Sequence, residues 1–140
     1  TSKRELARLK LIASRERKHG RPLSDDPLFA SRLAQVEIDL MALEITNLRV
    51  LSAEAEKRAP GPEASLLKIK GTEIQQALTE LSMAAVGPMA QPFKSVANDP
   101  DFDEFTAGLA PRYCNFRKTT IYAGSNEIQR NIISKMTLGL

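Results

Sequence analysis

The chain has 140 residues, a net charge of +3, 42% hydrophobic residues and 26% charged residues, which suits one globular domain with its own core. No apolar run approaches the roughly 20 residues needed to cross a bilayer, and the single cysteine, Cys114, rules out an internal disulfide and a cysteine-rich metal cluster. We therefore expect a cytoplasmic protein that spans no membrane and holds no metal.

The first predicted helix is strongly basic. Leu6, Leu9 and Ile12 lie at helical spacing, and Gly20 and Pro22 are expected to stop the helix. The first 21 residues hold eight Lys or Arg side chains against two Glu side chains. Such a run can bind a phosphate group or can be a solvated helix face, and both interpretations stay open. Nucleic acid is not an expected partner, because no recognised motif or aromatic stacking platform accompanies the charge.

The second predicted helix is unusually long. Ser24, Asp25 or Asp26 can cap its start, and the helix is expected to run from Pro27 to about Ala59. Two apolar stripes run along it, so we expect the helix to be covered on more than one side, as in a bundle or at a subunit contact. The first stripe consists of Phe29, Leu33, Val36, Leu40, Leu43, Asn47 and Val50, and the second of Ile38, Met41, Ile45 and Leu48.

Further helices complete the pattern. Residues 60–62 read Pro-Gly-Pro and break the chain, and a third helix is expected from there to Val86. Residues 89–106 are expected to be irregular, and Ser125 can cap a last helix. No strand-like alternation of convincing length is present. We therefore predict one all-α domain over residues 1–140, an antiparallel bundle of four-helix type.

Residue types alone indicate little catalytic chemistry. His19 is the only histidine and has no nucleophile elbow to pair with, so we expect it at a helix end, where it meets the helix dipole. Cys114 is expected to be a small buried apolar residue rather than a nucleophile. The acidic residues are scattered, and the Glu-x-x-His pairs of a di-iron bundle are missing.

A Gly-Ser turn before the last helix is the one local feature that could bind a ligand. Gly124 and Ser125 precede a helix whose first turn presents free backbone N–H groups at the positive end of the dipole. Such a corner can hold an anion or a carbonyl group. An ordinary Ser N-cap explains the same residues, and the residues alone favour that interpretation.

The end of the chain resembles the closing signature of the acyl-CoA dehydrogenase family. Residues 121–133 read Ile-Tyr-Ala-Gly-Ser-Asn-Glu-Ile-Gln-Arg-Asn-Ile-Ile, and the family pattern is Ile-Tyr, a variable residue, Gly, Thr or Ser, two polar residues and Ile-Gln-Arg. Residues 135–140 and the Pro-Gly-Pro break with residues 63–68 are also similar to the family. The similarity points to the bacterial branch that includes the large subunit of pimeloyl-CoA dehydrogenase. It covers essentially the whole chain, as the C-terminal helical domain.

The resemblance implies an FAD enzyme that oxidises an acyl-CoA to the trans-2-enoyl-CoA. In the family, a carboxylate removes the α-proton, the β-hydride passes to flavin N5, and backbone N–H groups hold the thioester carbonyl. The flavin lies between domains and between subunits. The resemblance therefore also implies N-terminal and middle domains and a homo- or hetero-oligomer, a dimer or a tetramer. An isolated C-terminal domain is expected to be inactive.

Four residues beside the last helix match the family's site. Ala123 stands where many members have the catalytic Glu, and it cannot accept a proton, so no catalytic side chain is assigned, although its N–H can still polarise a thioester. Gly124 permits close approach, and Ser125 stands where a Thr or Ser meets the flavin pyrophosphate region. Glu127 stands where a polar residue contacts FAD from another subunit in several members, and a carboxylate there departs from the pattern.

The resemblance also bears on the start of the chain. Arg17, or Arg15 if the register slips, resembles the arginine that closes the first helix of the bundle and reaches the FAD pyrophosphate, although the usual aromatic residue before Gly20 is missing. Some branches carry the base on this helix, and counting back from Arg17 places that position before Thr1. We therefore expect a piece of a longer protein, with the base in the preceding part. The alternatives are a catalytically silent subunit that pairs with an active one, and a helical interaction module without flavin.

Overall fold

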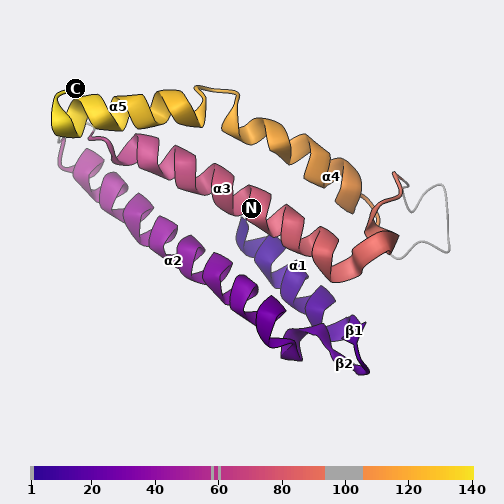
Figure 1. Ribbon diagram of the computed structural model, residues 1–140. Coiled ribbons are helices and arrows are strands. Elements are labelled where there is room, and N and C mark those ends of the chain that lie inside the picture. The colour runs from indigo at the N-terminus through magenta and orange to yellow at the C-terminus, as the bar shows by residue number, and fades with distance from the viewer. Residues whose placement is uncertain (1, 58, 60, 94–105) are drawn as a thin grey trace.

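The computed structural model describes residues 2–57, 59, 61–93 and 106–140. These residues form an antiparallel bundle of five α-helices. The helices are α1 (Ser2–Arg15), α2 (Pro27–Ala55), α3 (Glu63–Val86), α4 (Leu109–Phe116) and α5 (Asn126–Leu138). α4 and α5 follow one another along α3 and together make the fourth column (Figure 1). The predicted all-α fold of four-helix type is confirmed, and no described helix is long and apolar enough to cross a membrane.

Helix α3 is the centre of the bundle. It packs against α1 and α2 on one side and against α4 and α5 on the other (Figure 1). The most deeply buried large side chains are Leu9 and Ile12 of α1 and Leu81 of α3, which are 0%, 2% and 1% exposed. Burying one such side chain contributes about 1.5–3 kcal/mol to folding. The core therefore lies where α1 crosses the second half of α3.

The long helix α2 begins as predicted and ends earlier. Asp26 is its N-cap, and the Oδ1 atom accepts a hydrogen bond from the backbone N–H of Phe29 at 2.9 Å. The helix ends at Ala55 rather than near Ala59, because Lys57 adopts a left-handed backbone with a φ of 56°. The capping prediction is confirmed, and the predicted end was four residues too far along the chain.

A small β-hairpin replaces the predicted last turn of the first helix. α1 ends at Arg15, and β1 (Arg17–Lys18) pairs antiparallel with β2 (Arg21–Pro22). The two loop residues, His19 and Gly20, have φ values of 53° and 79°. Two consecutive residues of positive φ make the tight turn whose twist suits a two-residue hairpin. The expectation of a helix up to Gly20 was therefore wrong, and His19 lies in a hairpin loop rather than at a helix end.

The other predicted breaks lie close to where the sequence places them. α3 begins at Glu63, directly after the Pro-Gly-Pro break, and ends at Val86, where Gly87 takes a φ of 68°. Short 3₁₀ turns follow at Gly87–Ala90 and, later, at Arg117–Thr120. Of the predicted irregular stretch 89–106, residues 94–105 lie outside the described residues.

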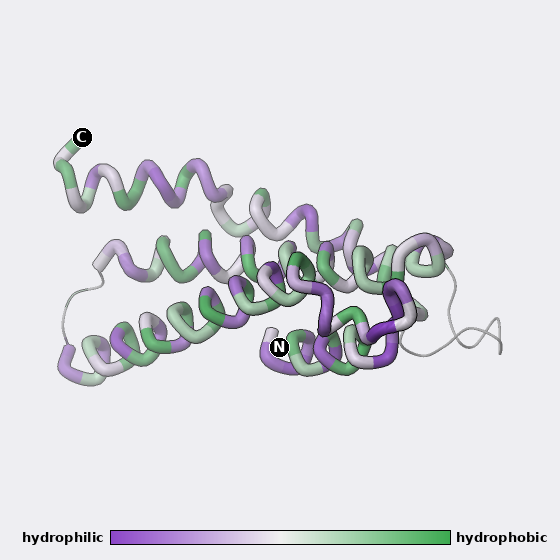
Figure 2. The backbone as a smooth tube through the Cα atoms, turned by 60° about the horizontal axis from the view of Figure 1, so that its bottom comes forward, coloured by the Kyte–Doolittle hydropathy of each residue, from purple (hydrophilic) through white to green (hydrophobic). Residues whose placement is uncertain are grey.

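Helix α2 has one buried face and one exposed face. Phe29, Val36 and Leu40 from the first predicted stripe are buried in the core. The second stripe, from Ile38 to Leu48, stays exposed. Figure 2 shows hydrophobic residues recurring along the whole of α2, as the two stripes require. The first stripe of α2 therefore packs against the bundle as predicted. No part of the chain that the structure describes packs against the second stripe.

Candidate functional site: the turn between α4 and α5

The fourth column of the bundle is interrupted by a tight turn at residues 121–125. Ala123 and Gly124 both have left-handed backbones, with φ values of 54° and 83°. This conformation is uncommon for a residue with a side chain, so two in succession define a sharp corner. Ile121 and Tyr122 before it are exposed. The corner therefore presents its backbone to the outside of the domain.

Gly124 is the residue that the corner requires. A Cβ atom at this position would lie 2.7 Å from the Nε2 atom of Gln129, so the end of that flexible side chain would have to move. The φ of 83° is also a conformation that glycine adopts at little cost. Both observations agree with the glycine that the family pattern has at this position.

Ser125 caps α5, and the corner before it has free backbone donors. The Oγ atom of Ser125 accepts a hydrogen bond from the N–H of Ile128 at 3.4 Å, which confirms the predicted cap. Within the described residues, the backbone N–H groups of Ala123 and Gly124 form no hydrogen bond. Unpaired N–H groups beside the positive end of a helix attract an anion or a carbonyl oxygen. The geometry of the turn is compatible with an anion corner, and the binding of a ligand there stays a prediction.

Glu127 adds a negative charge to the same helix end. Its own backbone N–H and then the Ser125 hydroxyl hydrogen-bond to the carboxylate, and both lower the pKa of Glu127 below its usual value. Arg130 and Lys68 lower this pKa further by attraction. The carboxylate is therefore charged at neutral pH and occupies part of the positive end of α5.

A buried polar contact fixes this helix end to α3. Asn126 is only 4% exposed, its Oδ1 accepts a hydrogen bond from Lys68 Nζ at 2.9 Å, and its Nδ2 donates to Thr72 Oγ1 at 3.2 Å. Lys68 Nζ also donates to the backbone carbonyl of Thr119 at 3.1 Å. One lysine of α3 therefore holds both sides of the turn, the segment before it and the helix after it.

The segment that leads into the turn is fixed in the same way. The Nε2 atom of Gln76 donates to the carbonyls of Phe116 and Arg117 at 3.2 and 3.3 Å. In return, Nη2 of Arg117 donates to the carbonyl of Gln76 at 3.1 Å and to Oγ1 of Thr79 at 3.2 Å. The Arg117 guanidinium also lies 4.4 Å from the ring centre of Tyr113, a cation–π distance.

Sequence reasoning missed this polar row on α3, which consists of Lys68, Thr72, Gln76 and Thr79. The first three follow at intervals of four residues, so they share one helix face. The available signal was this row of polar residues at helical spacing on one face of α3. It predicts polar backbone groups packed against that face, which is what the turn supplies.

Two predicted residues are placed differently from expectation. Arg17 was expected to close the first helix, but it lies exposed on β1, two residues beyond the helix end, and the alternative, Arg15, is the last residue of α1. Figure 1 shows the hairpin and the α4–α5 turn at opposite edges of the domain, with α3 between them. The fold therefore brings Gly124, Ser125 and Glu127 together and leaves Arg17 apart. Cys114 is exposed rather than buried, because α4 buries Leu109 and Ala110 instead.

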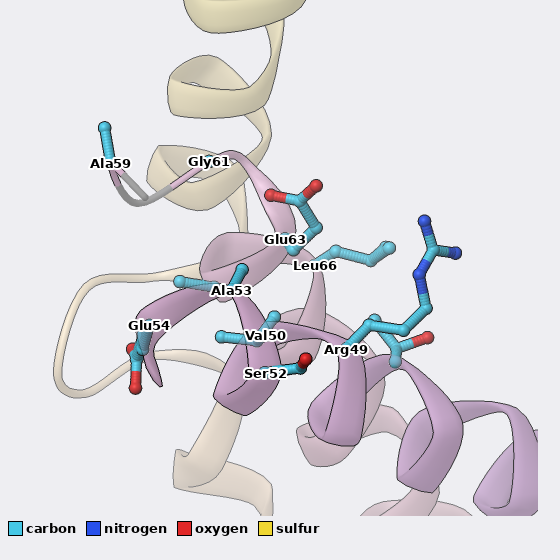
Figure 3. A pocket seen from close by; sticks show the side chains of 11 residues that line it. Arg49, Val50, Ser52, Ala53, Glu54, Ala59, Gly61, Glu63 and Leu66 are labelled. Atoms are coloured by element: carbon cyan, nitrogen blue, oxygen red, sulfur yellow. The ribbon is translucent and has the colours of Figure 1, made fainter. Parts of the chain in front are cut away.

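A groove of about 560 Å³ lies away from this turn, between the end of α2 and the start of α3. Figure 3 shows its lining, with Arg49 and Val50 from α2 and Glu63 and Leu66 from α3. None of the residues with a predicted role lines it. The turn and the groove are separate features of the surface.

The architecture is that of a helical domain that closes larger dehydrogenase chains. In the solved ChsE4–ChsE5 complex from Mycobacterium tuberculosis, the matching chain superposes with a TM-score of 0.79 and 27% identity over 99% of this chain and 35% of that one. The solved FAD complex of PigA gives a TM-score of 0.78 over 99% of this chain and 33% of that one. At 18% identity, this second likeness concerns the fold alone.

The chain belongs to the acyl-CoA dehydrogenase family, because residues 2–138 match the family described as "Acyl-CoA dehydrogenase, C-terminal domain". The acyl-CoA dehydrogenase IpdE1 of Mycobacterium tuberculosis is 34% identical over 139 residues. That match covers 98% of this chain and 32% of the relative, so the chain spans about a third of the relative's length. The family resemblance is confirmed. The pimeloyl-CoA dehydrogenase branch stays a prediction.

Proposed function

We propose that this chain is the C-terminal domain of an FAD-dependent acyl-CoA dehydrogenase that oxidises acyl-CoA to trans-2-enoyl-CoA. In this proposal N-terminal and middle domains complete the enzyme, and the domain supplies part of the flavin site and a subunit contact. The observation that carries the proposal is the corner at Ala123 and Gly124, where two unpaired N–H groups stand beside the capped start of α5. The thiol of Cys114, the one cysteine of the chain, is exposed, which suits a reducing cytoplasm.

The corner suits the groups that such an enzyme must hold. The N–H of Ala123 is a donor for the thioester carbonyl, and a donor fixed in place stabilises the negative charge that develops on that oxygen. Gly124 lets a ligand approach the backbone closely, and the Ser125 end of α5 favours a phosphate oxygen. When bound, FAD supplies the hydride acceptor. The residues present therefore fit the cofactor and the thioester that the family uses.

Glu127 has a narrower part in this proposal. Its carboxylate is charged and already accepts hydrogen bonds from its own N–H and from Ser125. A negative group repels a pyrophosphate and attracts hydroxyl groups, which can donate to it. We therefore assign Glu127 to hydroxyl groups of the cofactor rather than to its phosphates.

In this proposal, Arg17 contacts a flavin whose other contacts come from a second subunit. It lies on the hairpin, at the opposite edge of the domain from the corner (Figure 1). An exposed arginine can form paired hydrogen bonds with a phosphate of a neighbouring chain. Arg17 is therefore assigned to the pyrophosphate of a flavin whose other contacts come from another copy.

The base is not on the corner, and this leaves a second candidate function. The methyl group of Ala123 accepts no proton, and in this proposal the carboxylate comes from the part of the protein outside this chain. If that part carries no carboxylate facing the flavin, the protein is a catalytically silent subunit that pairs with an active one. The absence of an acid at Ala123 is the observation that favours this candidate.

The test measures flavin retention. The full-length protein is incubated with FAD, gel-filtered and examined by visible absorption, and we expect a retained flavin band. Gly124→Ala should weaken FAD binding about tenfold or more, the equivalent of about 1.4 kcal/mol. Gly139→Ala is the matched control, because Gly139 also has a positive φ, of 71°, but has open space around it at the far end of α5. A full-length protein that stays colourless removes the flavin assignment.

The same protein separates the two candidate functions. Purified alone and loaded with FAD, an active enzyme bleaches its flavin when an acyl-CoA is added. A silent subunit retains the colour until its partner is present. Bleaching by the lone protein therefore excludes the silent subunit.

A further inference from the structure

We propose that Lys68 is a positioning residue for the thioester site. Its ammonium group holds the turn at Ala123 and Gly124 in the shape in which the Ala123 N–H polarises the thioester carbonyl. The inference rests on the proposed function, because it concerns the same corner. It adds a residue of α3, outside the turn, that acts on the substrate only through the backbone of the turn.

The turn has few bonds of its own that keep its shape. Residues 121–124 are all exposed. Within the described residues, their backbone N–H groups form two hydrogen bonds, from Ile121 and Tyr122 to the carbonyl of Lys118 at 2.9 and 3.1 Å. Ala123 has a φ of 54°, a strained conformation for a residue that has a Cβ atom. Such strain persists only where the surrounding structure imposes it, so the shape of the turn must be set from outside.

Lys68 joins the two ends of the turn. Its Nζ atom donates to the backbone carbonyl of Thr119 at 3.1 Å, before the turn, and to Oδ1 of Asn126 at 2.9 Å, after it. Thr119 is 5% exposed and Asn126 is 4% exposed, so both bonds lie on the buried side of the turn. A hydrogen bond from a charged donor is about twice as strong as a neutral one. The ammonium group therefore keeps both ends of the turn within hydrogen-bond reach of a single atom.

No other side chain in the part of the chain that the structure describes bonds to both ends. Gln76 bonds only to the segment before the turn, and Thr72 bonds only to Asn126 after it. Figure 1 shows the turn between α4 and α5 alongside α3, the helix that carries all three side chains. Loss of Lys68 would therefore release the two ends from each other, whereas loss of Gln76 or Thr72 would weaken one end only.

The ammonium group also keeps its charge beside the corner. Both of its acceptors are neutral, and within the described residues it has no carboxylate partner. The hydrogen bond from its own N–H lowers the pKa of Glu127 most, and attraction by Lys68 lowers this pKa further, so the field of Lys68 reaches the start of α5. A positive charge there stabilises the negative charge that develops on the thioester oxygen. The position and the charge of Lys68 therefore favour the same state of the substrate.

The carbonyl stretching band of a bound thioester measures the effect directly. A hydrogen bond to the carbonyl weakens its double bond and lowers the frequency of this band. The full-length protein, loaded with FAD, is mixed with a trans-2-enoyl-CoA that carries an isotope label at the thioester carbonyl, and infrared difference spectra locate the band. We expect a downshift in the parent protein. Lys68→Met should lose about half of the downshift or more, because the N–H of Ala123 is then no longer held in one direction.

Lys70→Met is the matched control. Lys70 lies on the same helix, carries the same charge and pairs with Glu73 at 3.0 Å rather than with the turn. Its replacement should leave the carbonyl band unchanged. Lys68→Arg is the conservative variant, which keeps the charge and offers several donors, so it should restore most of the downshift. Circular dichroism verifies that each variant keeps its helices.

Asn126→Ala keeps the ammonium group and removes one of its two acceptors. It should lose part of the downshift, and it provides a second measurement if Lys68→Met does not fold. In a protein that turns over, Lys68→Met should also reduce the rate of flavin reduction at saturating acyl-CoA about tenfold, with a change of less than about threefold in the acyl-CoA dissociation constant. A lysine with a purely structural role would lower the melting temperature and change neither the band nor this rate.

The carbonyl band separates failure of this inference from failure of the proposed function. A parent protein that binds no enoyl-CoA, or binds it without a downshift, overturns the role of the corner in the proposed function and this inference with it. A downshift that both Lys68→Met and Asn126→Ala leave unchanged overturns this inference alone, and so does an equal loss in Lys70→Met. The band needs no turnover, so the measurement applies equally to an active enzyme and to a silent subunit that binds acyl-CoA.

Discussion

The Nζ atom of Lys68 lies 2.9 Å from Oδ1 of Asn126, although the two residues are 58 positions apart in the chain. The same ammonium group donates to the carbonyl of Thr119. These bonds join the middle helix of the bundle to both sides of the turn at Ala123 and Gly124. The backbone donors of the turn are therefore held by a side chain outside it, as a preorganised site requires.

Replacing Asn126 by Ala should destabilise the domain by about 1–3 kcal/mol, because Lys68 would lose a buried acceptor and Thr72 a buried donor. Urea unfolding monitored by circular dichroism measures the change. Asn115→Ala is the matched control, because Asn115 is exposed on α4, and it should change stability by less than about 0.5 kcal/mol. Equal effects of the two substitutions on the free energy of unfolding would show that the buried contact of Asn126 does not stabilise the domain.

Glycine-to-alanine substitutions should have opposite signs at two positions. Gly71 lies inside α3, and a Cβ there would meet only Leu43 Cδ2 at an ordinary 3.9 Å. Gly71→Ala should stabilise the domain by about 0.5–1 kcal/mol through helix propensity. Gly124→Ala should destabilise it by about 1–2 kcal/mol, because a φ of 83° strains a residue that has a Cβ. Thermal unfolding of the two variants distinguishes these outcomes, and equal signs would contradict the described turn.

A buried core residue and an exposed residue of α2 should respond differently to truncation. Leu81 is 1% exposed, so Leu81→Ala should cost about 2–5 kcal/mol by leaving a cavity. Ile45 is 59% exposed, so Ile45→Ala should change the stability of the domain by less than about 0.5 kcal/mol. Chemical denaturation at low micromolar concentration tests both expectations. A large loss for Ile45→Ala at low concentration would place this residue in the core.

Asp26 should make the start of α2 sensitive to acid. Lys18 and then the backbone N–H of Phe29 hydrogen-bond to its carboxylate, and both lower the pKa of Asp26 below its usual 3.8. A carboxyl group with a lowered folded-state pKa stabilises the protein above its unfolded-state value, and this stabilisation is lost as the pH falls through the folded-state pKa. Asp26→Asn keeps a capping side chain but cannot titrate. The variant should therefore unfold with a flatter pH dependence below about pH 4, which acid titration by circular dichroism records.

Local signals in the sequence predicted most of the fold. Asp26 and Ser125 have short oxygen side chains placed just before apolar runs, and both cap the expected helices. The Pro-Gly-Pro break and Gly87 mark the two ends of α3 as predicted. Each of these signals lies within a few residues of the helix end that it determines, so it can be recognised without knowledge of the tertiary structure.

The missed features depend on contacts between distant residues. The hairpin at Arg17 to Pro22 is closed by its own two-residue turn, but the sequence offers only Gly20 and Pro22, which equally stop a helix. The role of Lys68 depends on Asn126 and Thr119, more than 50 positions away. The corner at Ala123 was recognisable only by its family resemblance, because a left-handed alanine has no local sequence signal.

The wide separation of Arg17 from the corner has a consequence for how much FAD stays bound when the protein is diluted. If each flavin takes its pyrophosphate contact from one copy and its corner contacts from another, then a lone copy offers two half-sites and no whole one. Cofactor loss and dissociation of the copies become a single event. On dilution the holoenzyme should then release its FAD more steeply than a simple one-site equilibrium allows, with the same midpoint for released FAD and for released subunits.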